Sequence, residues 1–404
     1  MTNGHSEISR RGFLGSVGAL MVLAACSSSG KSSARPSTTS TTLRNGSKRV
    51  WAGPPISSTP DANGLLLPEG YRSRVVATAG RPVGRTGYVF PPAPDGAATF
   101  ADPEVKGGWY LAVNAETGAT LGGGVSALRF DPDGEVVDAY RIVEGTNINC
   151  AGGGTPWGTW LTCEEVERGR VFEADPTTPN SGRDVPALGR FVHEAVAVDA
   201  SDRNLYLTED RPDGLFYRFT PERWPNLDAG VLEAAVVDGD GAVTWREVPD
   251  PSAATATIRT QGFGATPFNG GEGVASGDTP DGRRVWFTTK GDNVVRELDP
   301  AAGSMREIYR AGDASTLHGV DNLWWDEPSQ RLFVAEDGDD MELMVLDRTG
   351  RTTPLLQLTG HDGSEITGPT MDPRRTTLHF SSQRGASGTN AGVTYAVTGP
   401  FPTT

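Results

Sequence analysis

Acidic residues recur at matching places along the chain. Four stretches of similar sequence open with a carboxylate, continue through a short apolar segment and a turn, and end in a segment alternating apolar and polar residues. These stretches are 193–210, 271–290, 320–337 and 364–383, and their opening carboxylates are Glu194, Glu272, Asp321 and Glu365. Alternation with a period of two is typical of β-strands. Each stretch is therefore predicted to be two strands joined by a turn.

A second set of polar residues stands where the second strand of each copy ends. The positions are Cys163, Glu209, Thr289, Glu336 and Ser382. Cys163, Glu209 and Glu336 are candidate metal ligands, as is Glu164, which directly follows Cys163. Asn149 opens the copy that contains Cys163, so it corresponds to Glu194, and it is a candidate substrate contact. Asp210, Lys290 and Asp337 directly follow the second-strand positions, and the sequence leaves open which member of each pair points inward.

Carboxylates that face one another in a closed space cannot all stay ionised, because they repel one another unless cations lie between them. Carboxylate oxygens suit Ca²⁺, Mg²⁺ or Fe³⁺ better than Zn²⁺. The chain has 5 histidines, none paired at the spacing of a zinc site. Each carboxylate alone could be a solvated turn residue. Acidity at the same position in four copies favours a ring of metal ligands.

The spacing of the copies predicts the architecture. The openings are 45 residues apart from Asn149 to Glu194, 49 from Glu272 to Asp321 and 44 from Asp321 to Glu365. A period of about 40–50 residues with several short strands is typical of a β-propeller. We therefore predict an all-β propeller of about six blades. The first strands would line its axis and bring the carboxylates together. The longer step after Glu194 predicts an insertion or a degenerate blade at about 221–268.

Composition supports this fold class and excludes several functions. The chain of 404 residues has 52 glycines and 29 prolines, which suits short strands and many turns better than long helices. With 36 basic and 51 acidic residues, its net charge of −15 argues against nucleic-acid binding and against attachment to anionic lipid by a basic patch. Three cysteines are too few for a disulfide-dense scaffold.

The first 26 residues are predicted to be an export signal. Ser9 to Leu14 contains a twin-arginine pattern, and an apolar run too short to span a bilayer follows. The ending Leu-Ala-Ala-Cys predicts lipidation of Cys26, with a plain cleaved signal peptide as the alternative. Residues 27–55 are predicted to be a flexible Ser/Thr-rich linker and 56–404 a single propeller domain. We thus expect an extracytoplasmic monomer that touches the membrane only through its lipid.

The run from Asn149 to Glu165, NCAGGGTPWGTWLTCEE, resembles the hallmark of the PhoX-type alkaline phosphatases. Similar motifs occur at 67–71, 107–116, 124–130 and 193–195, so the resemblance covers about residues 60–390. It implies a six-bladed propeller that hydrolyses phosphoesters outside the cytoplasm. It also implies ferric iron bridged by a cysteine thiolate, with calcium and a bridging oxo group. By the motif, Cys163 would be the bridging cysteine. A disulfide between Cys150 and Cys163 is the alternative for that thiol.

The expected reaction is attack on a small phosphoester by an oxygen that bridges metal ions. No G-x-S-x-G motif offers a serine nucleophile. Arg384 is the candidate catalytic residue because a guanidinium can donate two hydrogen bonds to phosphate, although it could equally be a surface arginine. The final repeat, Ser381 to Gly385, departs from the family pattern. A calcium-dependent lactonase-like propeller and a metal-stabilised binding module therefore remain alternatives.

Overall fold

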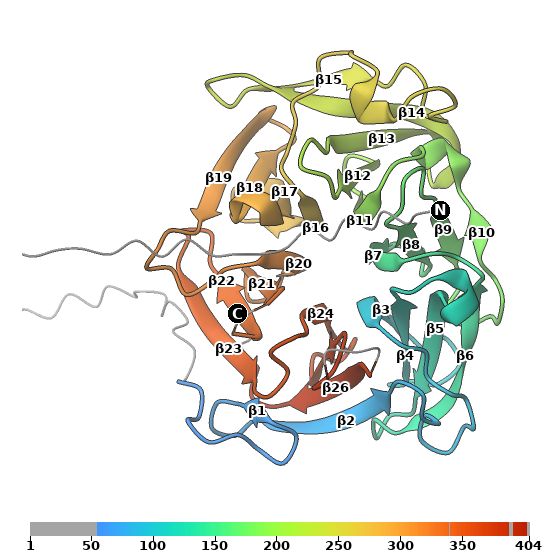
Figure 1. Ribbon diagram of the computed structural model, residues 1–404, viewed down its shortest axis with the longest axis vertical. Coiled ribbons are helices and arrows are strands. Elements are labelled where there is room, and N and C mark those ends of the chain that lie inside the picture. Colours follow the sequence, from blue (N-terminus) through green and yellow to red (C-terminus); the bar gives the residue numbers. More distant parts are fainter. Residues whose placement is uncertain (1–54, 339, 388–390, 402–404) are drawn as a thin grey trace, which may run out of the picture. The chain divides into compact units, whose positions relative to one another are not determined.

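Short strands separated by tight turns make up almost all of the regular structure in the computed structural model, which describes residues 55–338, 340–387 and 391–401. The strands form six antiparallel sheets of four or five strands. The sheets are arranged around a common axis as the blades of a propeller (Figure 1). The predicted all-β, six-bladed fold is confirmed. The predicted export signal, Cys26 and nearly all of the predicted linker lie outside the described residues.

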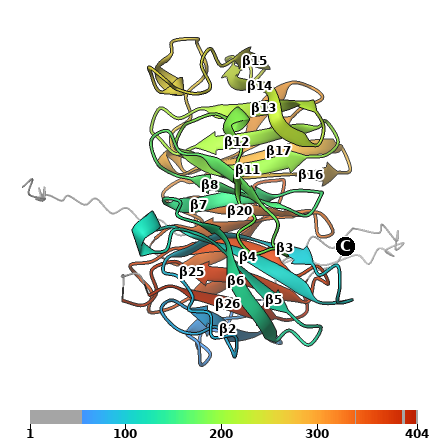
Figure 2. The same ribbon diagram turned by 90° about the vertical axis from the view of Figure 1, so that its right-hand side faces the viewer.

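The first three blades follow the chain order. The first contains β3 (Pro94–Ala101), β4 (Trp109–Ala115), β5 (Gly124–Phe130) and β6 (Val136–Glu144). The second contains β7 (Asn149–Gly154), β8 (Trp160–Glu164), β9 (Val171–Ala174) and β10 (Arg183–Asp184). The third contains β11 (His193–Asp199), β12 (Asn204–Glu209), β13 (Phe216–Arg223), β14 (Asn226–Val237) and β15 (Val243–Glu247). Figure 2 shows β11 to β15 in order from the middle of the propeller to its edge.

The other three blades complete the ring. The fourth contains β16 (Gly271–Thr279), β17 (Gly282–Thr289), β18 (Val294–Asp299) and β19 (Ser304–Arg310). The fifth contains β20 (Val320–Asp326), β21 (Arg331–Glu336), β22 (Glu342–Leu346) and β23 (Thr352–Leu358). The sixth contains β24 (Ile366–Met371), β25 (Thr377–Ser382) and β26 (Val393–Thr398). The first strand of each blade faces the axis, so β3, β7, β11, β16, β20 and β24 form the inner ring (Figure 1).

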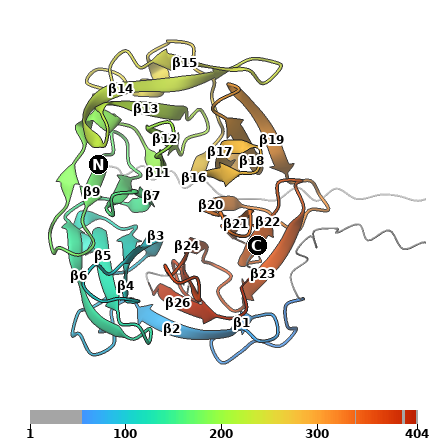
Figure 3. The same cartoon turned by 180° about the vertical axis from the view of Figure 1, so that it is seen from behind.

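Two strands from the start of the described chain join the last two blades. β2 (Arg72–Thr78) pairs with β26 as the fourth strand of the sixth blade, and β1 (Leu65–Leu66) pairs with β23. Figure 3 shows β2 beside β26 and β1 beside β23. The sixth blade is therefore built from both ends of the propeller sequence, which the repeat pattern had not predicted.

Aromatic side chains pack one blade against the next. Phe216 of the third blade stacks on Phe287 of the fourth, with ring centroids 4.1 Å apart, and Trp286 of the fourth stacks on Trp325 of the fifth at the same separation. Such stacked pairs stabilise a core beyond their buried area. They hold the blades at fixed angles and so fix the positions of the inner strands.

Residues 221–268 belong to the third blade. They contain the end of β13, the long β14, β15 and a 3-10 turn, η3 (Ile258–Thr260). β14 and β15 are the fourth and fifth strands of that sheet, and Ile258 is buried in the core that they share with β11–β13. This segment lengthens the outer part of one blade, away from the inner strands.

Candidate metal centre

Five of the six inner strands carry a potential metal ligand at the same structural position. In β3, β7, β11, β16 and β20 the first residue pairs with the end of the next strand, and a β-bulge follows that pair. The residue directly after the pair is a carboxylate or a thiol in all five strands: Asp95, Cys150, Glu194, Glu272 and Asp321. β-Bulges commonly re-aim a side chain next to a functional site. We call these five residues the inner ring.

A second set of polar residues directly follows the second strand of each blade. Its members are Glu116, Glu165, Asp210, Lys290, Asp337 and Gln383. The first five of them line a polar cavity of about 200 Å³, together with Cys150, Glu272, Asp321, Glu365 and Arg384. Gln383 donates hydrogen bonds to Asp95 and Glu116 and so joins the two sets at the sixth blade. We call these six residues the outer ring.

The two rings, together with Glu365 directly before β24, bring ligand atoms within 4.8 Å of one another in four overlapping groups. The groups are Asp95–Glu116–Cys150, Cys150–Glu165–Glu194, Glu194–Glu272–Asp321 and Asp321–Asp337–Glu365. Cys150, Glu194 and Asp321 each belong to two groups. The groups therefore form a continuous arc of carboxylates with one thiol in it. Multivalent cations commonly bind to this kind of donor set.

Glu194 lies at the centre of this arc and has no hydrogen-bond partner. The residue is 0% exposed, and neither carboxylate oxygen has a partner among the described residues. Burial raises its pKa well above the usual range, and Glu272 and Glu165 raise it further. A buried carboxylate without a partner is costly, and a cation between Glu194 and its neighbours would remove that cost. The residues present therefore fit a metal ion.

The neighbouring groups have pKa values shifted in the same direction. Burial raises the pKa of Glu116 to about 7, and burial with repulsion from Glu116 raises that of Glu165 to about 8. Burial, Asp95 and Glu194 raise the pKa of the Cys150 thiol. Carboxylates and thiols bind metals in their deprotonated forms, so a bound cation would reverse each of these shifts.

Two basic residues balance part of this charge. Lys290 Nζ lies 3.1 Å from Glu272 Oε1, 3.0 Å from Asp321 Oδ2 and 3.2 Å from Asp337 Oδ2. Burial lowers the pKa of Lys290, but Asp321 and Glu272 raise it by more, so the ammonium stays charged. Arg384 Nη2 lies 2.7 Å from Glu365 Oε1. Both basic side chains remain about one third exposed and are accessible from solvent.

Five of the residues predicted from the sequence come together here. Glu194, Glu272, Asp321 and Glu365 all belong to the ligand groups, and Arg384 lines the same cavity. Arg384 is thus a residue of the centre and not an isolated surface arginine. The four carboxylates were predicted from the repeat, because the first strand of every blade must face the axis, and Arg384 was predicted from its place near the last repeat and its ability to bind phosphate.

The structure places the predicted ligands Cys163 and Glu164 outside the four ligand groups. Cys163 is buried in an apolar cluster with Val171 and Leu188, and both it and Cys150 are free cysteines. Glu164 forms an ion pair with Arg170 at 2.8 Å and accepts a hydrogen bond from the Asn147 amide. The cysteine of the centre is Cys150.

Glu209, Glu336 and Asn149 also lie apart from the ligand groups. Glu209 accepts hydrogen bonds from the Tyr217 hydroxyl at 2.7 Å and from Arg259 Nη1 at 2.9 Å. Glu336 accepts hydrogen bonds from the amides of His318 and Glu342. Asn149 is fully buried and donates a hydrogen bond to Thr162 Oγ1. In the structure these side chains therefore support loops and strand ends and lie outside the ligand groups.

The sequence alignment of the repeats was mostly one residue out of step with the residues that line the centre. Asn149 pairs with Glu164 and His193 pairs with Glu209, and the residues that follow them, Cys150, Glu165, Glu194 and Asp210, are the ones that line the centre. Successive side chains point in opposite directions along a strand, and a one-residue shift therefore selects the wrong face. Asp210, Lys290 and Asp337 stood beside the chosen residues. Asp95 had no such signal, because 94–101 had not been identified as an inner strand.

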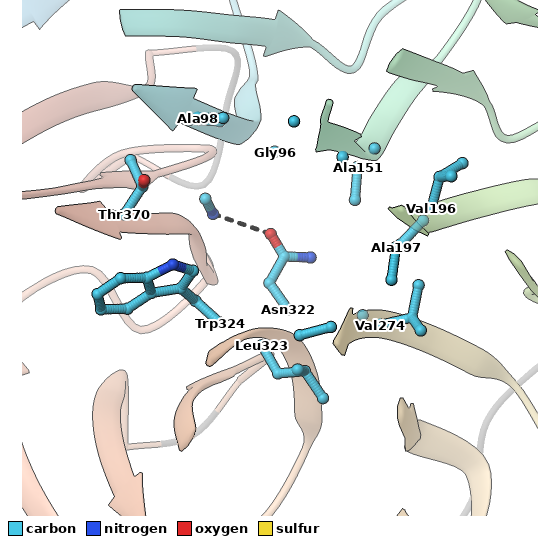
Figure 4. Close-up of a pocket in the computed structure, with 18 of the residues that line it drawn as sticks. Gly96, Ala98, Ala151, Val196, Ala197, Val274, Asn322, Leu323, Trp324 and Thr370 are labelled. Carbon is cyan, nitrogen blue, oxygen red and sulfur yellow. Dashed lines mark hydrogen bonds between the residues drawn. The ribbon is translucent and has the colours of Figure 1, made fainter. Parts of the chain in front are cut away.

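Small residues follow the inner ring and let the six inner strands approach closely. They line an axial channel of about 320 Å³, part of which Figure 4 shows. A Cβ atom on Gly96 would lie 2.5 Å from Ala151 Cα, and one on Gly273 would lie 2.5 Å from the Leu323 nitrogen. In the channel, Asn322 accepts a hydrogen bond from the Gly368 amide at 2.8 Å (Figure 4). Its Nδ2 donates to Asp321 Oδ1 at 2.8 Å and orients that ligand.

Comparisons with known proteins agree with this architecture. The sequence model of the family described as alkaline phosphatase PhoX matches residues 123–171 and 167–313. The structure of Pseudomonas fluorescens PhoX with vanadate, a transition state analogue, is similar to this chain, with a TM-score of 0.71 and 20% identity over 85% of this chain and 98% of that one. A gluconolactonase from Xanthomonas campestris has a TM-score of 0.42 and 15% identity over 79% and 99% of the two chains. No curated protein sequence matches this chain.

Proposed function

We propose that the chain is a phosphoester hydrolase that uses metal ions bound by the two rings, because the PhoX alkaline phosphatase family model matches residues 123–171 and 167–313 and the fold is similar to that of Pseudomonas fluorescens PhoX. The observation that best supports metal dependence is the Glu194 carboxylate, which is buried without a hydrogen-bond partner and belongs to two ligand groups. Without a bound cation this group would have to be protonated or remain an uncompensated charge in the interior.

The donor types suggest which ions bind on each side of the arc. Glu194, Glu272 and Asp321 offer only carboxylate oxygens, which suit Ca²⁺. Cys150 adds a thiolate between Asp95, Glu116, Glu165 and Glu194, and a mixed thiolate and carboxylate set suits Fe³⁺. When bound, such cations would supply positive charge for phosphate oxygens and lower the pKa of a water molecule.

The chain's own basic residues would bind and orient the substrate. Lys290 and Arg384 line the cavity with part of each side chain exposed, so their charged ends can reach an incoming anion. A guanidinium can donate two parallel hydrogen bonds to a phosphate group, which fixes its orientation. Arg384 is therefore proposed as a catalytic residue that contacts the phosphoryl group. Because the attacking oxygen would come from water, no protein nucleophile is required.

The test combines metal analysis with hydrolysis of 4-nitrophenyl phosphate. Glu194→Gln keeps the volume of the side chain and removes its charge. It should lower metal content and reduce kcat/KM by about 100-fold or more, since even loss of a residue that orients a ligand costs about 10–100-fold. Glu336→Gln is the matched control, because Glu336 is buried outside the ligand groups. A Glu194→Gln variant with full activity and full metal content would contradict the proposal.

We also propose that the protein works outside the cytoplasm as a monomer with a lipid on Cys26. The twin-arginine pattern supports this, since that route exports folded proteins and lets metal be inserted first. Among the described residues, no helix has the length and apolar character needed to cross a bilayer. Mass spectrometry of the mature protein from its native host would reveal a lipid on Cys26.

A further inference from the structure

A second cavity, of about 870 Å³, lies in the first blade, outside the metal centre. Three segments form its walls: residues 79–92, which lead toward β3, residues 119–123, which join β4 to β5, and residues 141–145, at the end of β6. The residues that line it include Tyr88, Val89, Phe90, Leu121 and Arg141. None of them belongs to the ligand groups.

Each wall of this cavity leads within a few residues to a ligand of the metal centre. Pro92 is three residues before Asp95, Ala119 is three residues after Glu116, and Gly145 is five residues before Cys150. Fully extended, three residues span at most about 10 Å and five residues at most about 18 Å. Asp95, Glu116 and Cys150 form one ligand group. The cavity is therefore adjacent to the thiol side of the arc.

Hydrogen bonds hold these walls in place. The Glu116 amide donates to the Ala93 carbonyl at 2.8 Å, and the Ile148 amide donates to the Thr117 carbonyl at 2.9 Å. Arg141 Nη2 donates to the Gly123 carbonyl at 2.8 Å, and the Tyr88 hydroxyl lies 2.7 Å from Ser126 Oγ. The cavity is thus preformed, and a ligand would not have to order its walls.

The walls favour an apolar ligand without charge. Val89 is 55% exposed and Leu121 is 63% exposed, and they are two of the five large apolar residues that are exposed in the described part of the chain. Single exposed apolar residues are common, but two on the wall of one cavity indicate a binding surface. Arg141 and Glu144 are the charged residues of the wall and have opposite signs, so the wall carries no net charge and does not favour a charged ligand.

The sizes of the two cavities complement each other. The cavity at the metal centre, about 200 Å³, is smaller than the roughly 300–1,000 Å³ usual for a small-molecule site, whereas the second cavity lies within that range. The smaller cavity has room for a phosphoryl group but leaves the organic group of an ester outside. On the basis of the proposed function, we propose that the second cavity binds the aromatic or other bulky apolar organic group of a phosphomonoester substrate.

The test compares two substrates in matched variants of the full chain. The double variant Val89→Ser/Leu121→Ser should lower kcat/KM for 1-naphthyl phosphate by about tenfold or more, as expected for lost contacts in an apolar pocket. It should change kcat/KM for glycerol 2-phosphate by less than about twofold, because that small polar alcohol gains little from an apolar wall. Val137→Ser is the control, since Val137 is 53% exposed in the same blade and does not line the cavity.

A binding measurement separates this inference from the proposed function. Fluorescence titration with 1-naphthol should show saturable binding to the parent protein and to Val137→Ser, and at least about tenfold weaker binding to the double variant. Binding of 1-naphthol by a chain that hydrolyses neither ester would leave the cavity assignment standing and refute the phosphatase. Equal losses for both esters, or equal naphthol affinity in all three proteins, would overturn the assignment of the cavity.

Discussion

The two sides of the carboxylate arc differ in how their charge is balanced. On one side Lys290 and Arg384 form ion pairs with Glu272, Asp321, Asp337 and Glu365. On the other side Asp95, Glu116, Cys150 and Glu165 have no ion pair with a basic residue among those described in the structure. The first side is partly neutralised by the protein itself. The second side has only longer-range attraction from Arg384 and Lys290, so protonation or bound cations must neutralise the rest of its charge.

The largest expected effect tests the side without basic residues. Cys150→Ala should remove the thiolate from the centre and reduce both iron content and kcat/KM by about 100-fold or more. Cys163→Ala should retain iron and activity, because Cys163 lies in an apolar cluster, and should only lower the free energy of unfolding by about 1 kcal/mol. Metal analysis and denaturant titration of both variants would check this. If Cys163→Ala lost its iron and Cys150→Ala kept it, the iron-binding thiol would be Cys163 and not Cys150.

The next effect tests the side that the protein neutralises. Lys290→Met removes one ammonium from three carboxylates and leaves their charge uncompensated. In chelator the variant should lose about 1–3 kcal/mol of its free energy of unfolding, which is less than the cost of breaking a fully buried ion pair because solvent reaches Lys290. Added Ca²⁺ should recover more of that loss than it recovers in the parent protein.

Thermal unfolding with and without Ca²⁺ measures both quantities. Arg218→Met provides a control, because Arg218 forms an ion pair away from the metal centre, in the outer part of the third blade. Its Nη2 lies 2.6 Å from Glu233 Oε2. Calcium should not restore that variant. Equal rescue of the two variants would show that the three carboxylates around Lys290 do not form a cation site.

A smaller effect concerns pH in the absence of metal. The folded pKa values of Glu116 and Glu165, about 7 and about 8, lie above the usual value near 4.5, so folding favours their protonated forms. With a chelator present, these two groups should therefore contribute most to the free energy of unfolding below about pH 4.5. Their contribution should fall as the pH rises toward 8. Bound metal should remove this decline. Urea titrations at several pH values would reveal it, and identical profiles with and without chelator would contradict it.

The smallest effect on activity is expected from Glu209. Glu209→Gln weakens an interaction with Arg259 and the Tyr217 hydroxyl but leaves both rings intact. Metal content and KM should stay within about twofold of the parent values, while the melting temperature falls by about 2–4 °C for each kcal/mol lost. A large loss of metal would mean that Glu209, and not Asp210, contributes to the centre.

Much of the fold and half of the centre could be predicted from the sequence. The repeat spacing predicted the blades, and equivalence between blades placed Glu194, Glu272 and Asp321 together, because that reasoning needs only the period. Choosing between Glu209 and Asp210 needs the position of the β-bulge that follows His193, and a bulge leaves no clear mark in the pattern. Cys150 was missed for the same reason, since the repeat had been aligned on Asn149.

The pairing of β2 with β26 has a consequence for biosynthesis. Asp95 and Glu365 reach the same centre from opposite ends of the propeller, and Gln383 links the last blade to Asp95 and Glu116. A ribosome-bound chain that lacks β26 leaves β2 without its partner, so the sixth blade, beside Glu365 and Gln383, is not yet closed. We therefore expect full loading with ions only after translation has delivered β26, so that the supply of metal matters to the finished polypeptide more than to its growing precursor.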